Sequence, residues 1–238
     1  MKKINAFTLA EILITLGIIG VVAAITIPGL INAYRAQQLR SQFLKAYSTV
    51  QQAFKLMESD DVDTNMRNYN TTNNPFYKTF AKYLSQSTIC GSYTDGNNVS
   101  TTKNPSGCYK YKISNIDEGY KYLNSNNFIG DGLFNNGQLM LPDGTLIFFD
   151  DSPQREGWKG VIIYIDINGY KKKPNRLGYD FFAFEVIEGV VHAIGETETS
   201  YIYNDDCKFG PSGKLGFTCS KRAKNESDYF KTVVKKIK

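Results

Sequence analysis

The sequence has only one histidine, His192, in 238 residues. Zinc sites of the HExxH type, which need two imidazoles, are therefore excluded, and a Ser-His-Asp triad would depend on this single side chain. There is no glycine-rich phosphate loop and no GxSxG nucleophile elbow, and the absence of a CxxC pair disfavours zinc and thioredoxin-like centres. We expect His192 on a strand, where a lone histidine is more often structural or exposed than catalytic. The sequence thus predicts a protein that is not an enzyme.

The chain also lacks a strong excess of either charge. It has 28 lysines and arginines against 23 acidic residues, and the formal charge of +5 is too mild and too dispersed to indicate nucleic-acid binding. The basic C-terminal segment 231–238 could contact DNA, but we expect a solvated charged end there, so DNA is not indicated as a partner. The composition excludes disordered, collagen-like and polytopic membrane proteins.

One long hydrophobic run is present near the N-terminus. No charged side chain occurs from Ile12 to Tyr34. At about 1.5 Å per residue, a helix of this length crosses a hydrocarbon core of ~30 Å. Lys2 and Lys3 precede the run and favour a cytoplasmic N-terminus, so the rest of the chain is expected to be translocated. A cleaved signal peptide and a plain membrane anchor are the simplest interpretations.

Neither of these interpretations explains Glu11, which stands at the start of the apolar run. A carboxylate costs roughly 2.5–3.5 kcal/mol at the middle of a membrane on insertion scales, and less near the interface. A side chain that is so costly in lipid needs a partner.

Residues 6–14 read AFTLAEILI, and this segment resembles the processing site of type IV pilins and type II secretion pseudopilins. In that family a prepilin peptidase cuts on the cytoplasmic side of the apolar helix and methylates the new N-terminal amine. The resemblance implies a leader peptide of residues 1–6 and cleavage between Ala6 and Phe7. The family's leader usually ends in glycine, whereas this leader ends in Ala6.

The resemblance also implies a role in assembly for Glu11. Subunits that stack with an axial offset bring the Phe7 amine of one copy near the Glu11 carboxylate of its neighbour. Leaving either charge buried and unpaired costs a few kcal/mol, so the pair favours correct register. Pro28 and Gly29 stand where the family commonly has a kink, and they predict a bend or melted turn near residues 25–29. That bend could serve assembly or be a plain helix kink.

An amphipathic pattern follows the apolar run. Apolar residues recur three and four positions apart, which predicts one buried face of a helix. We therefore expect a transmembrane segment at 7–34, an amphipathic segment at 35–58 and a globular head at 59–238. The stripe consists of Leu39, Phe43, Ala46, Tyr47, Val50, Ala53, Phe54 and Met57.

The head is expected to contain an antiparallel β-sheet. The predicted strands are 138–141, 145–149, 161–167, 181–187 and 190–194. The first two and the last two form hairpins around Pro-Asp-Gly and Glu-Gly turns. A short helix is expected at 75–85, and the segment from there to 137 has the pattern of an irregular loop with short strands. A long helix followed by an antiparallel sheet is an α+β arrangement, and the resemblance implies the pilin-like fold, in which the sheet packs across the amphipathic half of the helix.

The four cysteines form two pairs that are close in sequence, Cys90 with Cys108 and Cys207 with Cys219. In an exported head we expect two disulfides, and local pairing is favoured among the three connectivities that four cysteines allow. Each bond would stabilise the head by about 3 kcal/mol. Reduced cysteines are the alternative where the cell exterior lacks oxidising machinery.

A candidate calcium loop begins at Asp166, continues through Asn168 and Gly169, and is followed by Asp180. Calcium takes several oxygen ligands, but an EF-hand needs glutamate at its twelfth position, where this chain has Leu177. Because Asp and Asn in tight turns usually cap their own backbone, we expect no cofactor. Calcium held by Asp166, Asn168 and Asp180 is the alternative.

Together, the resemblance and the pattern predict a structural subunit of a type IV pilus-like or pseudopilus filament. Its expected partners are other pilin or pseudopilin subunits, the prepilin peptidase, the inner-membrane assembly machinery and the lipid bilayer. Before assembly it would be a single-pass membrane protein with an extracytoplasmic head, and afterwards part of a cell-surface or periplasmic filament. The alternative is a membrane-tethered extracellular binding module that does not polymerise.

Overall fold

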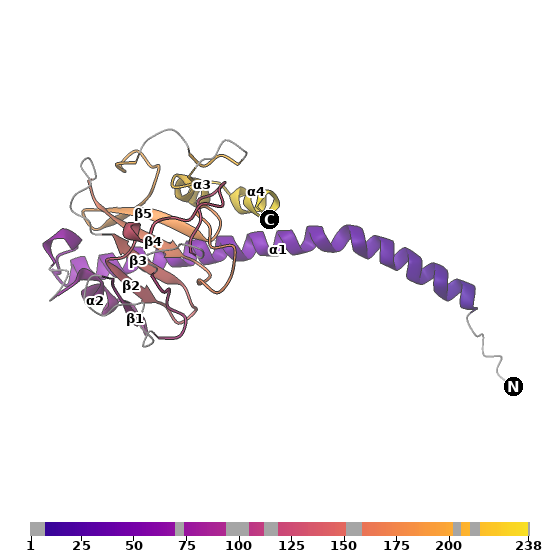
Figure 1. Cartoon of the computed structure of the whole chain (residues 1–238), viewed down its shortest axis with the longest axis horizontal. Helices are drawn as coiled ribbons and strands as arrows, with labels where there is room; N and C mark the ends of the chain where they lie inside the picture. The colour runs from indigo at the N-terminus through magenta and orange to yellow at the C-terminus, as the bar shows by residue number, and fades with distance from the viewer. Residues whose placement is uncertain are drawn as a thin grey trace.

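The computed structural model describes residues 8–69, 74–93, 105–111, 119–150, 159–201, 206–209 and 215–237. A long helix runs through a head of strands and short helices and extends far beyond it toward the N-terminus (Figure 1). The expected α+β class, with one long N-terminal helix and an antiparallel sheet, is confirmed.

Helix α1 spans Leu9–Ser59, and its 51 residues correspond to a length of about 77 Å. Residues 9–34 carry apolar side chains that the rest of the molecule leaves almost entirely uncovered. The second half is the predicted amphipathic segment. Every member of the predicted stripe is buried except Tyr47, which is half-buried against the same core.

Of the bend or melted turn predicted near residues 25–29, the melted turn is wrong, because these residues are helical and Pro28 lies inside α1. Although a proline lacks the backbone N–H that donates to the preceding turn, α1 continues as a helix on both sides of Pro28. Figure 1 shows α1 curving gently, without a break, in its exposed half.

Six strands form one antiparallel meander in which each strand pairs with the next in sequence. The five predicted strands are confirmed to within one or two residues, and a short edge strand, β1, is added. The strands are β1 Thr88–Gly91, β2 Gly137–Met140, β3 Leu146–Asp150, β4 Val161–Asp166, β5 Phe181–Ile187 and β6 Val190–Ala193.

The sheet is buried on both faces. On one face the stripe of α1 packs on alternate strand residues, and the ring centroids of Phe43 and Phe182 lie 4.7 Å apart. On the other face an aromatic layer from the loops covers the sheet, with Tyr120 stacked 3.9 Å from Phe181. This second layer was not predicted, because its residues lie in loops without a periodic pattern.

Two helices follow the sheet, α3 at Cys219–Asn225 and α4 at Tyr229–Lys236. The predicted solvated charged end at 231–238 is confirmed for the charges of the described residues, since Lys231, Lys235 and Lys236 are exposed, but this segment is also a helix with a buried apolar face. Helix α4 buries Phe230 and Val233 against α1, while its lysines point to solvent. The helix is amphipathic, but its pattern is too short to be recognised with certainty in a lysine-rich segment.

The remaining elements are short. Helix α2, at Phe76–Ala81, confirms a helix within 75–85, although it is shorter than predicted. It packs on the end of α1, where the rings of Phe54 and Phe80 lie 4.9 Å apart. The 3₁₀ turns η1 and η2 span Met66–Asn68 and Asp131–Leu133.

Candidate functional site

The N-terminal end of α1 is closed by a capping box between Thr8 and Glu11. The Glu11 carboxylate accepts hydrogen bonds of 2.8 Å from both the backbone N–H and the hydroxyl of Thr8, and the Glu11 N–H donates to the Thr8 hydroxyl. The T-x-x-E spacing is visible in the sequence and is a known helix-start signal. It gives Glu11 a partner within its own chain. Ala6 and Phe7 lie outside the described residues.

The apolar half of α1 is long and apolar enough to cross a membrane by length and composition. Its large side chains, from Leu9 to Tyr34, have no partner within the described part of the head. Exposed apolar surface of this extent indicates contact with lipid or with another protein. Pro28 and Gly29 lie within this exposed half.

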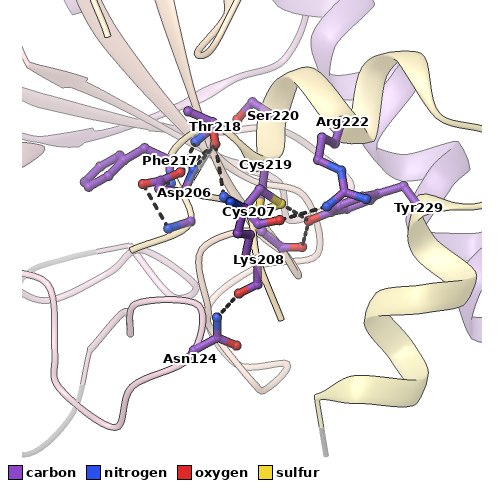
Figure 2. Close-up of a disulfide and its surroundings, with 12 residues drawn as sticks. Asn124, Asp206, Cys207, Lys208, Phe217, Thr218, Cys219, Ser220, Arg222 and Tyr229 are labelled. Carbon is purple, nitrogen blue, oxygen red and sulfur yellow. Dashed lines mark hydrogen bonds between the residues drawn. A yellow bond between two sulfur atoms is a disulfide. The ribbon is translucent and has the colours of Figure 1, made fainter. Parts of the chain in front are cut away.

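Both predicted disulfides are confirmed, Cys90–Cys108 and Cys207–Cys219. The second bond lies at the junction between the sheet and the C-terminal helices, and both of its cysteines are completely buried (Figure 2). Next to it the Arg222 guanidinium donates to the Cys207 carbonyl at 2.7 Å, and the Tyr229 hydroxyl donates to the Gly178 carbonyl at 2.6 Å. The bond and these contacts connect α3 and α4 to the rest of the head.

Asp206 organises the same junction. Its carboxylate accepts hydrogen bonds from the backbone N–H groups of Gly216, Phe217 and Thr218, and from the Thr218 hydroxyl (Figure 2). A buried carboxylate with this many donors is well compensated. The sequence offered no signal for this role, because the donors come from a segment about ten residues away.

The candidate calcium residues lie together at the end of β4, which Asp166 closes, and in the loop that leads from there to β5. Asp166 accepts from the N–H groups of Asn168 and Gly169 and, at 2.7 Å, from the hydroxyl of Tyr120. The Asn168 amide nitrogen lies 3.5 Å from an Asp180 carboxylate oxygen. Both aspartates are completely buried.

The residues present fit a cation only in part. In favour of a cation, the side-chain oxygens of Asn168 and Asn175 are buried and have no hydrogen-bond partner among the described residues. Against it, Asp180 already accepts from the N–H groups of Asn175 and Arg176, so both aspartates act mainly as caps of their own loop, as Asp and Asn do in tight turns. Asp166, Asn168, Asn175 and Asp180 are the residues that would supply oxygen ligands to calcium.

Burial is the largest cause of the raised pKa values of Asp166 and Asp180, and the charge of Asp166 raises the pKa of Asp180 further. No ion pair to either carboxylate is formed by the residues that the structure describes. The Arg176 guanidinium donates instead to three backbone carbonyls. The folded loop therefore binds protons more tightly than the unfolded chain does.

The raised pKa values of Asp166 and Asp180 predict that the head loses stability as the pH rises. Groups with a raised folded pKa contribute stability below their unfolded pKa of about 4, and this contribution is lost as the pH rises through their folded values. From pH 5 to pH 8 we expect the free energy of unfolding to fall by roughly 4 kcal/mol, at about 1.4 kcal/mol per pH unit for a carboxyl that stays protonated only in the folded chain, and Asp180→Asn to remove most of the fall. Urea unfolding of the full chain in detergent micelles, repeated at several pH values, measures the slope of the free energy of unfolding against pH. Asp61→Asn, at an exposed turn, is the control, and an unchanged slope in Asp180→Asn contradicts the prediction.

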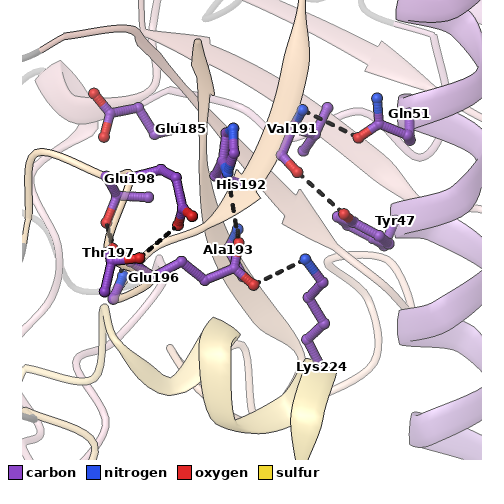
Figure 3. A network of polar contacts seen from close by, with 12 residues as sticks. Tyr47, Gln51, Glu185, Val191, His192, Ala193, Glu196, Thr197, Glu198 and Lys224 are labelled. Carbon is purple, nitrogen blue, oxygen red and sulfur yellow. Dashed lines mark hydrogen bonds and ion pairs between the residues drawn. The ribbon is translucent and has the colours of Figure 1, made fainter.

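His192 lies in a second polar cluster, which the sequence pattern did not predict (Figure 3). Its Nδ1 lies 3.7 Å from a Glu196 carboxylate oxygen, and the other oxygen of Glu196 pairs with Lys224 Nζ at 2.8 Å. The ligand atoms of His192, Glu196 and Glu198 lie within 4.8 Å of one another. The three side chains could ligate a divalent cation, but Lys224 already compensates one of the carboxylates.

Comparison with protein-family models, with curated proteins and with solved structures gave no match for this chain.

Proposed function

We propose that the chain is a pilin-like subunit of a type IV pilus-like or pseudopilus filament. A prepilin peptidase cuts between Ala6 and Phe7 and methylates the new amine. The mature helix then anchors the subunit in the membrane, with the head outside the cytoplasm. Assembly machinery in the inner membrane transfers the subunit into a filament, where Glu11 faces the Phe7 amine of a neighbouring copy.

The observation that carries this proposal is the division of α1 into two halves. Residues 12–34 are uncharged, predominantly apolar and largely exposed, while the half that begins near Ala36 forms part of the core of the head. A single continuous helix therefore joins a surface that needs an apolar environment to a soluble head. Such a helix can lie in lipid before assembly and among the helices of neighbouring copies afterwards.

The disulfides support an extracytoplasmic head. Disulfides persist in oxidising compartments and are rare in the cytosol. Both bonds belong to the head, and Cys207–Cys219 is fully enclosed within it. This agrees with the orientation that Lys2 and Lys3 favour.

Within this function, a minor pseudopilin of a type II secretion or DNA-uptake machine is the variant that the large, loop-rich head favours. The head is built around a six-stranded sheet with an added aromatic layer on the face opposite α1. Such a head is suited to capping or initiating a short filament.

The Thr8–Glu11 capping box favours the second candidate function, a membrane-tethered binding module that does not polymerise. The Glu11 carboxylate is hydrogen-bonded within its own helix, so a structural reason for the acid exists without a neighbouring subunit. The two functions therefore differ in whether Glu11 needs a second copy.

Shearing of filaments from the native host separates the two candidates. We expect the full chain in the sheared surface or pseudopilus fraction, and we expect deletion of the prepilin peptidase to hold it in the inner membrane. Recovery of the chain only in the membrane fraction, with the peptidase present, would support the tethered module instead.

A further inference from the structure

Two grooves flank Arg35 at the point where α1 leaves the head. One groove, of about 490 Å³, lies between α1, the loop that carries Lys173 and the end of α4 at Lys235. The other, of about 300 Å³, lies between α1 and the same loop on the side of Lys172. Arg35, Lys173 and Tyr179 line both grooves, so the two form one continuous surface around the helix.

This surface is basic. Six exposed cations from three separate parts of the chain line the grooves or stand next to a lining residue in sequence, and we call them the basic collar. They are Arg35, Lys171, Lys172, Lys173, Lys235 and Lys236. None of them forms an ion pair with any residue that the structure describes, and neither groove has an aspartate or glutamate in its lining.

The height of the collar along α1 is set by the apolar run. From Ile12 to Arg35 the helix rises about 35 Å, slightly more than a hydrocarbon core of ~30 Å. With Glu11 near one interface, Arg35 therefore stands in the headgroup layer of the opposite leaflet. In Figure 1 the C-terminal end of α4 lies near α1 where the helix leaves the head. Lys235, near this end of α4, lines the same groove as Arg35.

We propose that the basic collar binds the phosphate groups of anionic phospholipids and holds the head against the extracytoplasmic leaflet before assembly. The guanidinium of Arg35 can bind a phosphate with two parallel hydrogen bonds, and the lysines add point charges around it. Clusters of four to eight cations on the cytoplasmic side of a membrane-spanning helix are typical of binding to anionic lipid, and the same attraction acts at any leaflet that contains anionic lipid. The proposal rests on the membrane insertion of α1 in the proposed function, but not on polymerisation.

Hydrogen–deuterium exchange of the full chain in vesicles tests this binding. One set of vesicles is pure phosphatidylcholine, and the other contains about 30% phosphatidylglycerol, which gives a surface charge that attracts basic residues. We expect the backbone amides of 169–173 and 235–237 to exchange at least about fivefold more slowly in the anionic vesicles, and high salt to remove the difference. Inorganic phosphate added to the phosphatidylcholine vesicles should give no protection.

Charge reversal identifies the side chains responsible. Lys173→Glu/Lys235→Glu should abolish the protection, whereas Lys55→Glu/Lys82→Glu, which changes the net charge equally at exposed sites away from the grooves, should leave it intact. Exchange in β4 and β5 reports whether each variant is folded.

Two results would overturn the proposal. Equal exchange in both vesicle types would exclude anionic lipid and favour an acidic protein as the partner of the collar. Protection by inorganic phosphate alone would indicate a site for free phosphate. A chain that does not float with either type of vesicle would instead contradict the membrane insertion on which the proposed function depends.

Discussion

Glu11→Ala is expected to leave the head folded and to reduce the amount of chain in the sheared filament fraction by at least about 100-fold. Removing one partner of a buried ion pair costs about 3–5 kcal/mol, and in the proposed filament the variant would leave the Phe7 amine without a counter-charge among apolar helices. This penalty applies at each docking step, and about 3 kcal/mol corresponds to more than a hundredfold change in an equilibrium constant.

Two further variants separate the charge of Glu11 from its role as a helix cap. Glu11→Gln keeps an oxygen that can accept from the Thr8 N–H, since glutamine also completes a capping box, but it removes the charge. Thr8→Val removes the hydroxyl that contacts Glu11 and keeps the charge, at a cost of about 1 kcal/mol in helix capping.

If Glu11 pairs with a neighbouring amine, Glu11→Gln should fail to assemble as completely as Glu11→Ala, and Thr8→Val should assemble. The opposite pattern, in which Glu11→Gln assembles into filaments and Thr8→Val does not, would show that the acid serves to cap the helix. Immunoblots of the membrane fraction confirm that each variant is made and inserted.

Loss of the Cys207–Cys219 disulfide is expected to destabilise the head more than loss of Cys90–Cys108 does. Closing the loop between Cys207 and Cys219 contributes about 3 kcal/mol in the chain-entropy model, which corresponds to a fall of roughly 6–12 °C in melting temperature for a chain of this size. Both cysteines are completely buried, and the Cys207 sulfur lies 3.7 Å from the Tyr229 hydroxyl, so Cys207→Ser/Cys219→Ser also leaves two buried hydroxyl groups where the disulfide had been. Thermal unfolding of the full chain in detergent micelles measures the shift.

Cys90→Ser/Cys108→Ser is the matched control. Its disulfide closes a loop of similar length at the short edge strand β1, and Cys108 is only half-buried. We expect a smaller loss of stability and no effect on the C-terminal helices. Limited proteolysis should therefore release α3 and α4 in the first variant only. Equal effects of the two double variants would contradict a special role for the buried bond.

The long helix and the strands could be predicted because each carries its own local period. The stripe from Leu39 to Met57 repeats with the spacing of a helix over five turns, and β4 and β5 are rich in β-branched and aromatic residues. The local disulfide pairing could be predicted for a similar reason, since each pair is close in sequence. Features of this kind can be predicted without knowing the tertiary fold.

The parts that could not be predicted depend on contacts between distant segments. Tyr109, Tyr120 and Phe134 cover the far face of the sheet, but the loops that carry them have no period. The basic collar joins residues that are separated by about 200 positions in sequence, from Arg35 to Lys235. The Thr8–Glu11 capping box is different, because its spacing is a local signal that the sequence itself carries.

Intact-mass and N-terminal peptide analysis of the purified mature protein tests the assignment to the pilin family most directly. We expect a chain that has lost residues 1–6 and begins with N-methylated Phe7, because only the prepilin peptidase produces both changes. A chain that begins at Met1, or at a site within the apolar run such as Ala24, would contradict the proposed processing and with it the pairing of Glu11 with a neighbouring amine.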